Sequence, residues 1–322
     1  MTTTARLKRT VPVVLLGLLG FTAWINLPVV SLWFDGSADR IAALPDAPAV
    51  TKGQRVLVLS PHPDDETLCC GGMIQQARAR GATVYVAWMT AGDGFEFDAM
   101  LTERVPHPTA RNMRDLGQRR ASEALRAVGL LGVPADHTFM LGYPDGGLFQ
   151  LFTSHYDEAF TARHTGAASV YVRGALSPGA AYTGRQLEQD IRTVLNRVRP
   201  DLVLVPAPQD FHADHHTLSY IALRLLGERG QGDRLRFWVV HGGLEWPVPK
   251  GLHGKLPLTV PPRATTLAWQ KVPLSAAEQR NKLAALNAYR TQMRVMGRFM
   301  QAFVRENELL SPEPLPDPLG RP

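Results

Sequence analysis

The stretch "RVLVLSPHPDDETLCCGG", residues 55–72, decides the fold and contains much of the chemistry. Residues 56–59 form an apolar run of the kind that fills a strand buried on both faces of a sheet. A histidine, two aspartates and a glutamate then follow within the five positions 62–66. Because burying an unpaired carboxylate costs several kcal/mol, this charge directly after a strand indicates a functional site.

Apolar segments alternate with helical ones along the following part of the chain. The expected strands are 55–60, 83–89, 138–141, 201–206 and 234–241, and the expected helices are 66–80, 113–128, 184–199 and 214–230. Apolar strands separated by helices predict an α/β fold with a doubly wound, mostly parallel, Rossmann-like sheet and helices on both faces. A further helix is expected from the capping box of Ser275 and Glu278 to about Arg290 or further. The long loop 145–185 is expected to frame a site.

The N-terminal region contains 24 consecutive residues without charge, from Val11 to Phe34. At 1.5 Å per residue, such a helix is long enough to cross a hydrocarbon core of about 30 Å. Arg6, Lys8 and Arg9 precede it, so the positive-inside rule predicts a cytoplasmic N-terminus and an extracytoplasmic catalytic domain. Secretion after signal cleavage is the alternative. The predicted organisation is a basic N-terminus (1–10), a transmembrane anchor (11–34), a linker (35–52), a catalytic domain (53–310) and a Pro-rich tail (311–322).

The composition is that of a globular protein and excludes some classes of partner. Of the 322 residues, 45% are hydrophobic and 20% are charged. The formal charge is +6, but three of these charges lie in the N-terminal segment, and the remainder is too scattered to predict nucleic-acid binding. The two cysteines, Cys69 and Cys70, are adjacent, and neighbouring cysteines rarely bridge, so no disulfide framework is expected.

A second polar cluster, "PAPQDFHADHH" (206–216), follows the expected strand 201–206. Ligands of open α/β sheets bind beyond the carboxyl ends of the strands, so the two clusters face one crevice if their strands are neighbours. Two histidines and one carboxylate with an open position for water are typical of a hydrolytic zinc site. The alternative is a helix N-terminus with capping aspartates and surface histidines.

These residues carry a resemblance to a known family. "PHPDDE" (61–66) together with "HADHH" (212–216) resembles the PIG-L/LmbE family of zinc-dependent N-deacetylases, whose signatures are an H-P-D-D-E box and a distant H-x-D-H box. Further matches are "TAGDG" (90–94), "RRASEALRAVGL" (119–130), "LGYPDGGL" (141–148) and "AYRTQ" (288–292). The resemblance covers residues 55–292. Ala213 stands where the family often has proline, which leaves the ligand positions unaffected.

The resemblance implies a role for residues of the first box and one of the second. His62, Asp65 and His215 match the zinc ligands of the family. Asp64 matches the general base that takes a proton from the activated water. Adjacent carboxylates would then diverge, one held by the metal and one free.

Four further residues match functional positions of the family. His212 matches the histidine that stabilises the oxyanion and helps to protonate the leaving amine, and Asp214 matches the acid that orients it. Arg120 and Asp145 resemble substrate-contacting positions. A surface salt bridge for the arginine and a turn for the aspartate remain the alternatives.

The sequence therefore predicts a membrane-anchored, extracytoplasmic hydrolase that removes an N-acetyl group from an N-acetylglucosamine-type sugar or glycoconjugate. The expected cofactor is Zn²⁺, with Fe²⁺ as the alternative, because ligand type alone does not separate these ions. Two other functions stay open. One is a non-catalytic protein of the same fold that binds metal and glycan, and the other is a two-histidine, one-carboxylate iron enzyme.

Overall fold

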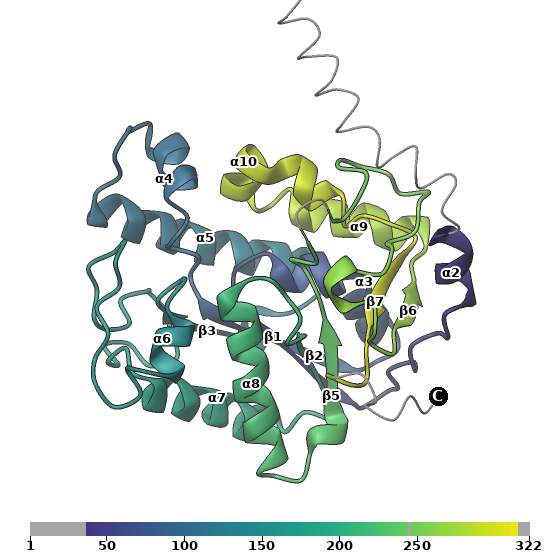
Figure 1. Cartoon of the computed structure of the whole chain (residues 1–322), viewed down its shortest axis with the longest axis horizontal. Coiled ribbons are helices and arrows are strands. Elements are labelled where there is room, and N and C mark those ends of the chain that lie inside the picture. The colour runs from purple at the N-terminus through teal and green to yellow at the C-terminus, as the bar shows by residue number, and fades with distance from the viewer. Residues whose placement is uncertain (1–36, 244–245, 315–322) are drawn as a thin grey trace, which may run out of the picture.

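The structure is a computed structural model that describes residues 37–243 and 246–314. A five-stranded parallel sheet forms its centre (Figure 1). The strands are β1 (Arg55–Ser60), β2 (Thr83–Thr90), β3 (Thr138–Tyr143), β4 (Leu202–Pro206) and β5 (Leu235–Trp238), in the order β3-β2-β1-β4-β5. The predicted α/β fold with a parallel sheet is confirmed.

Helices cover the sheet on both faces (Figure 1). On one side lie α3 (Asp65–Ala79), α5 (Ala110–Leu130) and α9 (Ala276–Leu286), and both α3 and α5 contact α9. On the other side lie α6 (Leu148–Phe152), α7 (Gly184–Val198) and α8 (Ala213–Gly227), with α6 in contact with α7 and α8. Outside these layers are α2 (Ser37–Ala43), α4 (Glu96–Glu103) and α10 (Arg290–Gln301), and α4 contacts α10. Three short 3₁₀ turns complete the helices: η1 (Ala135–His137), η2 (Gly232–Arg234) and η3 (Pro262–Ala264).

The central strand β1 pairs with β2 on one side and with β4 on the other. Its apolar residues 56–59 are almost completely buried, since helices lie above and below them. The chain winds from β1 toward β3 in one direction and from β4 toward β5 in the other. The reversal falls between β1 and β4, where an open α/β sheet leaves a crevice at its carboxyl edge.

Side-chain caps start several helices where the sequence indicates. The hydroxyl of Thr183 accepts a hydrogen bond from the N–H of Gln186 at the start of α7. Ser275 and Glu278 form both hydrogen bonds of a capping box at the start of α9. The predicted helix beyond this box is interrupted, because α9 ends at Leu286 and the fully buried Tyr289 precedes α10.

A two-stranded antiparallel sheet, β6 (Gln270–Pro273) and β7 (Asn307–Leu310), was not expected from the sequence. It contains Glu308, whose carboxylate accepts hydrogen bonds from the N–H groups of Gly72 and Met73 in α3. The ammonium group of Lys282 lies 2.7 Å from the same carboxylate. This buried ion pair joins α3, α9 and β7.

Two other expectations concern the cysteines and the termini. The sulfur atoms of Cys69 and Cys70 are bonded to each other in α3, although adjacent cysteines were expected to stay unbridged. The predicted anchor at 11–34 lies outside the described residues, as does most of the predicted tail. Among the helices of the described ranges, none combines the length and the apolar character that a membrane crossing requires.

Candidate metal centre and active site

The turn between β1 and α3 carries the first cluster, and the buried Glu66 holds it in place. One oxygen of its carboxylate accepts hydrogen bonds from the indole N–H of Trp88 (2.8 Å) and the backbone N–H of Asp64 (3.2 Å). The other accepts from the hydroxyl groups of Thr67 and Tyr289. The glutamate of the H-P-D-D-E box is therefore a support for the turn.

The two adjacent aspartates of this turn point to different places. Asp64 has a positive φ of 124°, a conformation that costs a non-glycine residue free energy. The carboxylate of Asp65 accepts the backbone N–H of His62 at 3.0 Å. The carboxylate of Asp64 instead lies 3.5 Å from the guanidinium of Arg120. The two carboxylates therefore have different partners.

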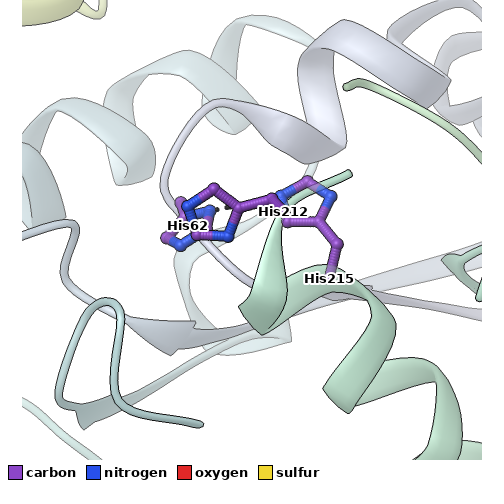
Figure 2. Close-up of side chains that lie close together, drawn as sticks. All are labelled: His62, His212 and His215. Carbon is purple, nitrogen blue, oxygen red and sulfur yellow. Dashed lines mark hydrogen bonds between the residues drawn. The ribbon is translucent and has the colours of Figure 1, made fainter. Parts of the chain in front are cut away.

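The second cluster lies at the start of α8, beyond the carboxyl end of β4. His212 is the N-cap residue, and its ring Nδ1 accepts the backbone N–H of Asp214 at 3.2 Å. His215, one turn into the helix, is fully buried. Figure 2 shows the imidazole groups of His62, His212 and His215 gathered in one place, the first from the turn after β1 and the other two from α8.

Three side-chain atoms from the two clusters form a small triangle. Oδ2 of Asp65 lies 3.1 Å from Nδ1 of His62 and 3.1 Å from Nε2 of His215. The two nitrogens are 3.3 Å apart. Two atoms bound to one tetrahedral zinc ion at about 2.0–2.1 Å lie about 3.3–3.4 Å apart. The three residues predicted as ligands therefore fit a divalent cation.

The charge around the triangle also suits a cation. Burial lowers the pKa of both histidines of the triangle, but the surrounding carboxylates outweigh this effect. Asp145 contributes most to a pKa of His62 well above the ordinary value. Asp210 and Asp65 raise the pKa of His215 to about 9. The carboxylates around both rings thus stabilise positive charge at this position, and a bound cation would supply that charge.

Two carboxylates contact the far nitrogen of His62. Its Nε2 lies 3.1 Å from Oδ1 of Asp145 and 3.2 Å from Oδ2 of Asp214. Such contacts fix the orientation of a metal-binding imidazole. The other oxygen of Asp145 accepts the N–H of Gly94 at 2.9 Å. Asp145, predicted to contact substrate, therefore also holds a predicted ligand.

Asp214 is fully buried, and its carboxylate accepts hydrogen bonds from the N–H groups of Gly146 (2.7 Å) and Leu148 (3.0 Å). It was predicted to orient His212. The hydrogen bond that joins these two residues comes from the backbone of Asp214, while its side chain holds the loop 145–148 against the site.

Arg120 is buried, not a surface residue. Its guanidinium donates to the carbonyl oxygens of Gly92 (2.6 Å) and Pro63 (3.1 Å). With its oxygen turned toward Arg120, the amide of Gln292 accepts a further hydrogen bond of 2.7 Å. Arg120 thus ties the turn that bears Asp64 to the loop after β2.

A cavity of about 340 Å³ opens beside the triangle. Asp64, Arg120, Asp145 and His212 line its polar side. Its apolar side is formed by Leu68, Phe95, Val240, Met296 and Phe299. His164 also lines it, so the insertion 145–185 contributes a wall, as expected from its length.

Sequence reasoning missed His241, Asp210 and the contribution of α10. His241 follows β5, so the strand-end criterion that found the other clusters applied to it as well. Its ring stacks on Phe299 of α10, with the centroids 6.2 Å apart and the planes at 11°. Asp210 was seen as part of the second cluster but given no role. No local sequence signal places Met296 and Phe299 over the cavity.

A comparison with models of protein families identifies the family of this chain. The family model described as "PIG-L: GlcNAc-PI de-N-acetylase" matches residues 57–226. This chain belongs to the PIG-L family. A relative from Saccharomonospora viridis, a 1D-myo-inositol 2-acetamido-2-deoxy-α-D-glucopyranoside deacetylase, is 30% identical over 258 residues, which is 74% of this chain and 85% of the relative. Seven other deacetylases of this substrate are matched over only 48–61% of their length.

Solved structures share the fold of this PIG-L protein. The antimicrobial A40926 pseudoaglycone deacetylase superposes with a TM-score of 0.51 at 20% identity, over 80% of this chain and 96% of that one. The N,N'-diacetylchitobiose deacetylase of Pyrococcus horikoshii also gives 0.51, at 16% identity, over 87% of this chain and 91% of that one.

The comparisons contradict the predicted localisation as a single-pass membrane protein with an extracytoplasmic catalytic domain. The relatives matched over most of this PIG-L chain are named as deacetylases of a sugar–inositol, a small polyhydroxylated molecule without a lipid. The prediction depended on the hydropathy of this segment and on the basic residues before it. A 24-residue apolar run is long enough to cross a membrane, but length does not establish that it does so.

Proposed function

We propose that this protein is a divalent-cation-dependent hydrolase that removes the N-acetyl group from an N-acetylglucosamine-type sugar. One observation carries the proposal. His62, Asp65 and His215 place three ligand atoms within 3.3 Å of one another, and the carboxylate of Asp64 stands beside them in the same cavity.

His62, Asp65 and His215 would hold the cation. When bound, it would lower the pKa of a water molecule and polarise the acyl oxygen. Zinc is the ion we propose, because two imidazoles and one carboxylate are typical of hydrolytic zinc sites. Iron(II) is the alternative, since the same donors suit it.

Asp64 would act as the general base. Burial, together with the neighbouring charge of Asp65, raises its pKa, and Arg120 opposes this shift. A carboxylate with a raised pKa accepts a proton readily from the attacking water and can return it to the leaving amine nitrogen. Asp64 is free for this task because it lies outside the triangle of ligand atoms.

His212 would stabilise the charge that develops on the acyl oxygen. Since its Nδ1 accepts the backbone N–H of Asp214, the proton of the neutral ring sits on Nε2. Burial, reinforced by the charges of His62 and His215, lowers the pKa of His212 to about 4. A neutral imidazole is a hydrogen-bond donor to an oxyanion, so in this proposal the amine receives its proton from Asp64.

The substrate class follows from the relatives and from the cavity. The curated relatives are named as deacetylases of 1D-myo-inositol 2-acetamido-2-deoxy-α-D-glucopyranoside, which makes this compound the first candidate. N,N'-diacetylchitobiose, the substrate in the name of a structural neighbour, is the second. The polar side of the cavity offers partners for sugar hydroxyls, and Leu68, Met296 and Phe299 offer apolar surface for a sugar ring.

The test is a direct assay for deacetylation. Metal-free protein is loaded with Zn²⁺ or Fe²⁺ and incubated with each candidate sugar, and acetate and free amine are measured in parallel. We expect one acetate per amine, with either sugar, and release by Asp64→Asn that is slower by about 10²–10⁴-fold. A protein that binds metal and sugar but releases neither product would support the non-catalytic alternative and overturn the proposal.

A further inference from the structure

The buried carboxylate of Asp210 contacts three histidines that lie on two segments of the chain. It lies in the loop between β4 and α8, at 2% exposure. Its Oδ1 accepts the backbone N–H of His212 at 3.0 Å. Its Oδ2 accepts the N–H groups of Val240 at 2.9 Å and His241 at 3.0 Å. The same oxygen lies 3.2 Å from Nδ1 of His215.

The contact with His215 bears on which ring nitrogen is available to a cation. A neutral imidazole has one N–H and one lone pair, and the partner of one nitrogen decides the state of the other. The negatively charged carboxylate of Asp210, 3.2 Å from Nδ1, favours the proton on that nitrogen through its charge. The lone pair is then on Nε2, the atom that lies 3.1 Å from Asp65.

The remaining surroundings of the ring do not fix this choice. Trp238 and His241 contact it edge to face, with centroids 5.6 Å and 4.8 Å away. Such contacts hold the plane of the ring but do not distinguish its two nitrogens. Among the described residues, Asp210 is the group that approaches Nδ1.

We propose that Asp210 is a positioning residue of the metal centre. It directs Nε2 of His215 toward His62 and Asp65 and fastens the loop after β5 to the start of α8. The inference rests on the proposed metal site, since it concerns how one ligand is oriented. Carboxylates that hold a ligand imidazole in this way are typically worth 10–100-fold in metal affinity.

The principal test compares Asp210→Asn with a matched control, Asp201→Asn. Asp201 directly precedes β4 at its opposite end, and its carboxylate accepts the backbone N–H of Arg55 at 2.8 Å without contact to the site. The zinc dissociation constant is measured by competition with a chelator, and the visible spectrum of the Co²⁺-loaded protein reports ligand geometry. We expect Asp210→Asn to weaken zinc binding about 10–100-fold and to alter the cobalt spectrum, and Asp201→Asn to do neither.

A second comparison tests whether Asp210 acts through the ring of His215. In a His215→Ala background, Asp210→Asn should not reduce the residual metal affinity any further. Undiminished zinc affinity and an unchanged cobalt spectrum in Asp210→Asn would overturn the inference. An equal loss of affinity in the His215→Ala background would also overturn it, because the role would then be structural.

Two outcomes separate this inference from the proposed function. If the unaltered protein bound no divalent cation, or if His215→Ala kept full affinity, the metal site itself would be wrong. If His215→Ala lost the metal while Asp210→Asn kept it, the role of Asp210 alone would be wrong.

Should Asp210→Asn fail to fold, Asp210→Glu keeps the charge but shifts it by one methylene group. This variant should bind Co²⁺ with an altered spectrum, and a native spectrum would contradict the inference.

Discussion

Nδ1 of His62 lies 3.3 Å from Nε2 of His215, although 153 positions separate the two residues in the chain. They meet because β1 and β4 are neighbours in the sheet and both end at the same edge. The two histidines therefore approach each other from opposite sides of the crevice between these strands. A cation bound there would connect two parts of the fold that are otherwise joined by the sheet and by loops.

The proposed ligands can be tested through stability as well as through metal content. A ligand that binds only the folded state adds about 2.7 kcal/mol to the free energy of unfolding at a free concentration 100 times its dissociation constant. We expect zinc to raise the melting temperature of the unaltered protein and to have little effect on His215→Ala. His216→Ala is the control, since that neighbouring ring contacts Tyr220. Equal stabilisation of both variants would contradict the assignment of His215.

Asp64→Asn should separate catalysis from metal binding. The amide keeps the size of the side chain and removes its basicity. We expect kcat to fall by about 10²–10⁴-fold, the usual contribution of a positioned base, while zinc affinity stays within a few-fold. Asp65→Ala, in contrast, should lose the metal. Asp64→Asn protein that lost zinc as completely as Asp65→Ala would show that the two carboxylates have been assigned wrongly.

His212→Asn should reduce turnover without weakening the start of α8. Asparagine is a favourable N-cap residue, so it can accept the helix N–H now bonded to Nδ1 of His212. The donor that we expect to face the acyl oxygen is lost, and removal of one such donor costs about 10²–10³-fold in kcat. His212→Ala should show the same kinetic loss together with a lower melting temperature. Unchanged kcat in His212→Asn would exclude the proposed role.

Asp93 should make stability depend on pH. Burial, with a smaller effect of Asp145, raises its pKa from 3.8 to about 6. The unfolded chain therefore releases this proton at a lower pH than the folded one, so stability should fall as pH rises from about 4 to about 6, by up to about 3 kcal/mol. Asp93→Asn should flatten this part of the profile, measured by urea unfolding. The exposed Asp136→Asn should leave it unchanged, and a matching change in both would refute the assignment.

The buried pair of Lys282 and Glu308 should matter for folding. Removing one partner of a buried ion pair typically costs about 3–5 kcal/mol, and Glu308 also accepts two backbone N–H groups of α3. We expect Glu308→Gln to lower the free energy of unfolding by an amount of this order. Glu306→Gln, at an exposed position two residues earlier, should have an effect within about 0.5 kcal/mol. Equal effects of the two changes would show that the pair is not needed.

Much of the sheet could be predicted because its signals are local. Strand β1 has the predicted bounds, since an apolar run buried on both faces ends where the charged residues begin. Thr183 and Ser275 mark the starts of α7 and α9 because the cap hydrogen bonds form within four residues. The short strands β6 and β7 have no such signal, since they are four residues each and their paired residues are 34 to 40 positions apart in the chain.

The functional site was also predictable only where its signals are local in the sequence. The triangle could be expected because both of its clusters follow strands. The contacts of Asp214 with Gly146 and Leu148 could not be read from the sequence, because they depend on how the loop after β3 returns over α8. Arg120 was predicted to contact substrate, and a surface salt bridge stayed open as the alternative, since nothing in "RRASEALRAVGL" shows that its helix faces the turn at Pro63.

The backbone conformation of Asp64 implies a trade-off between the stability of the fold and catalytic activity. Its φ of 124° suits glycine and is costly for aspartate. Asp64→Gly should therefore relax the turn and resist heat or urea better than the natural chain while losing turnover. Selection for durability alone would drive this position toward glycine. An aspartate in so unfavourable a conformation is then a sign that this enzyme has lower stability than it could have, in exchange for catalysis.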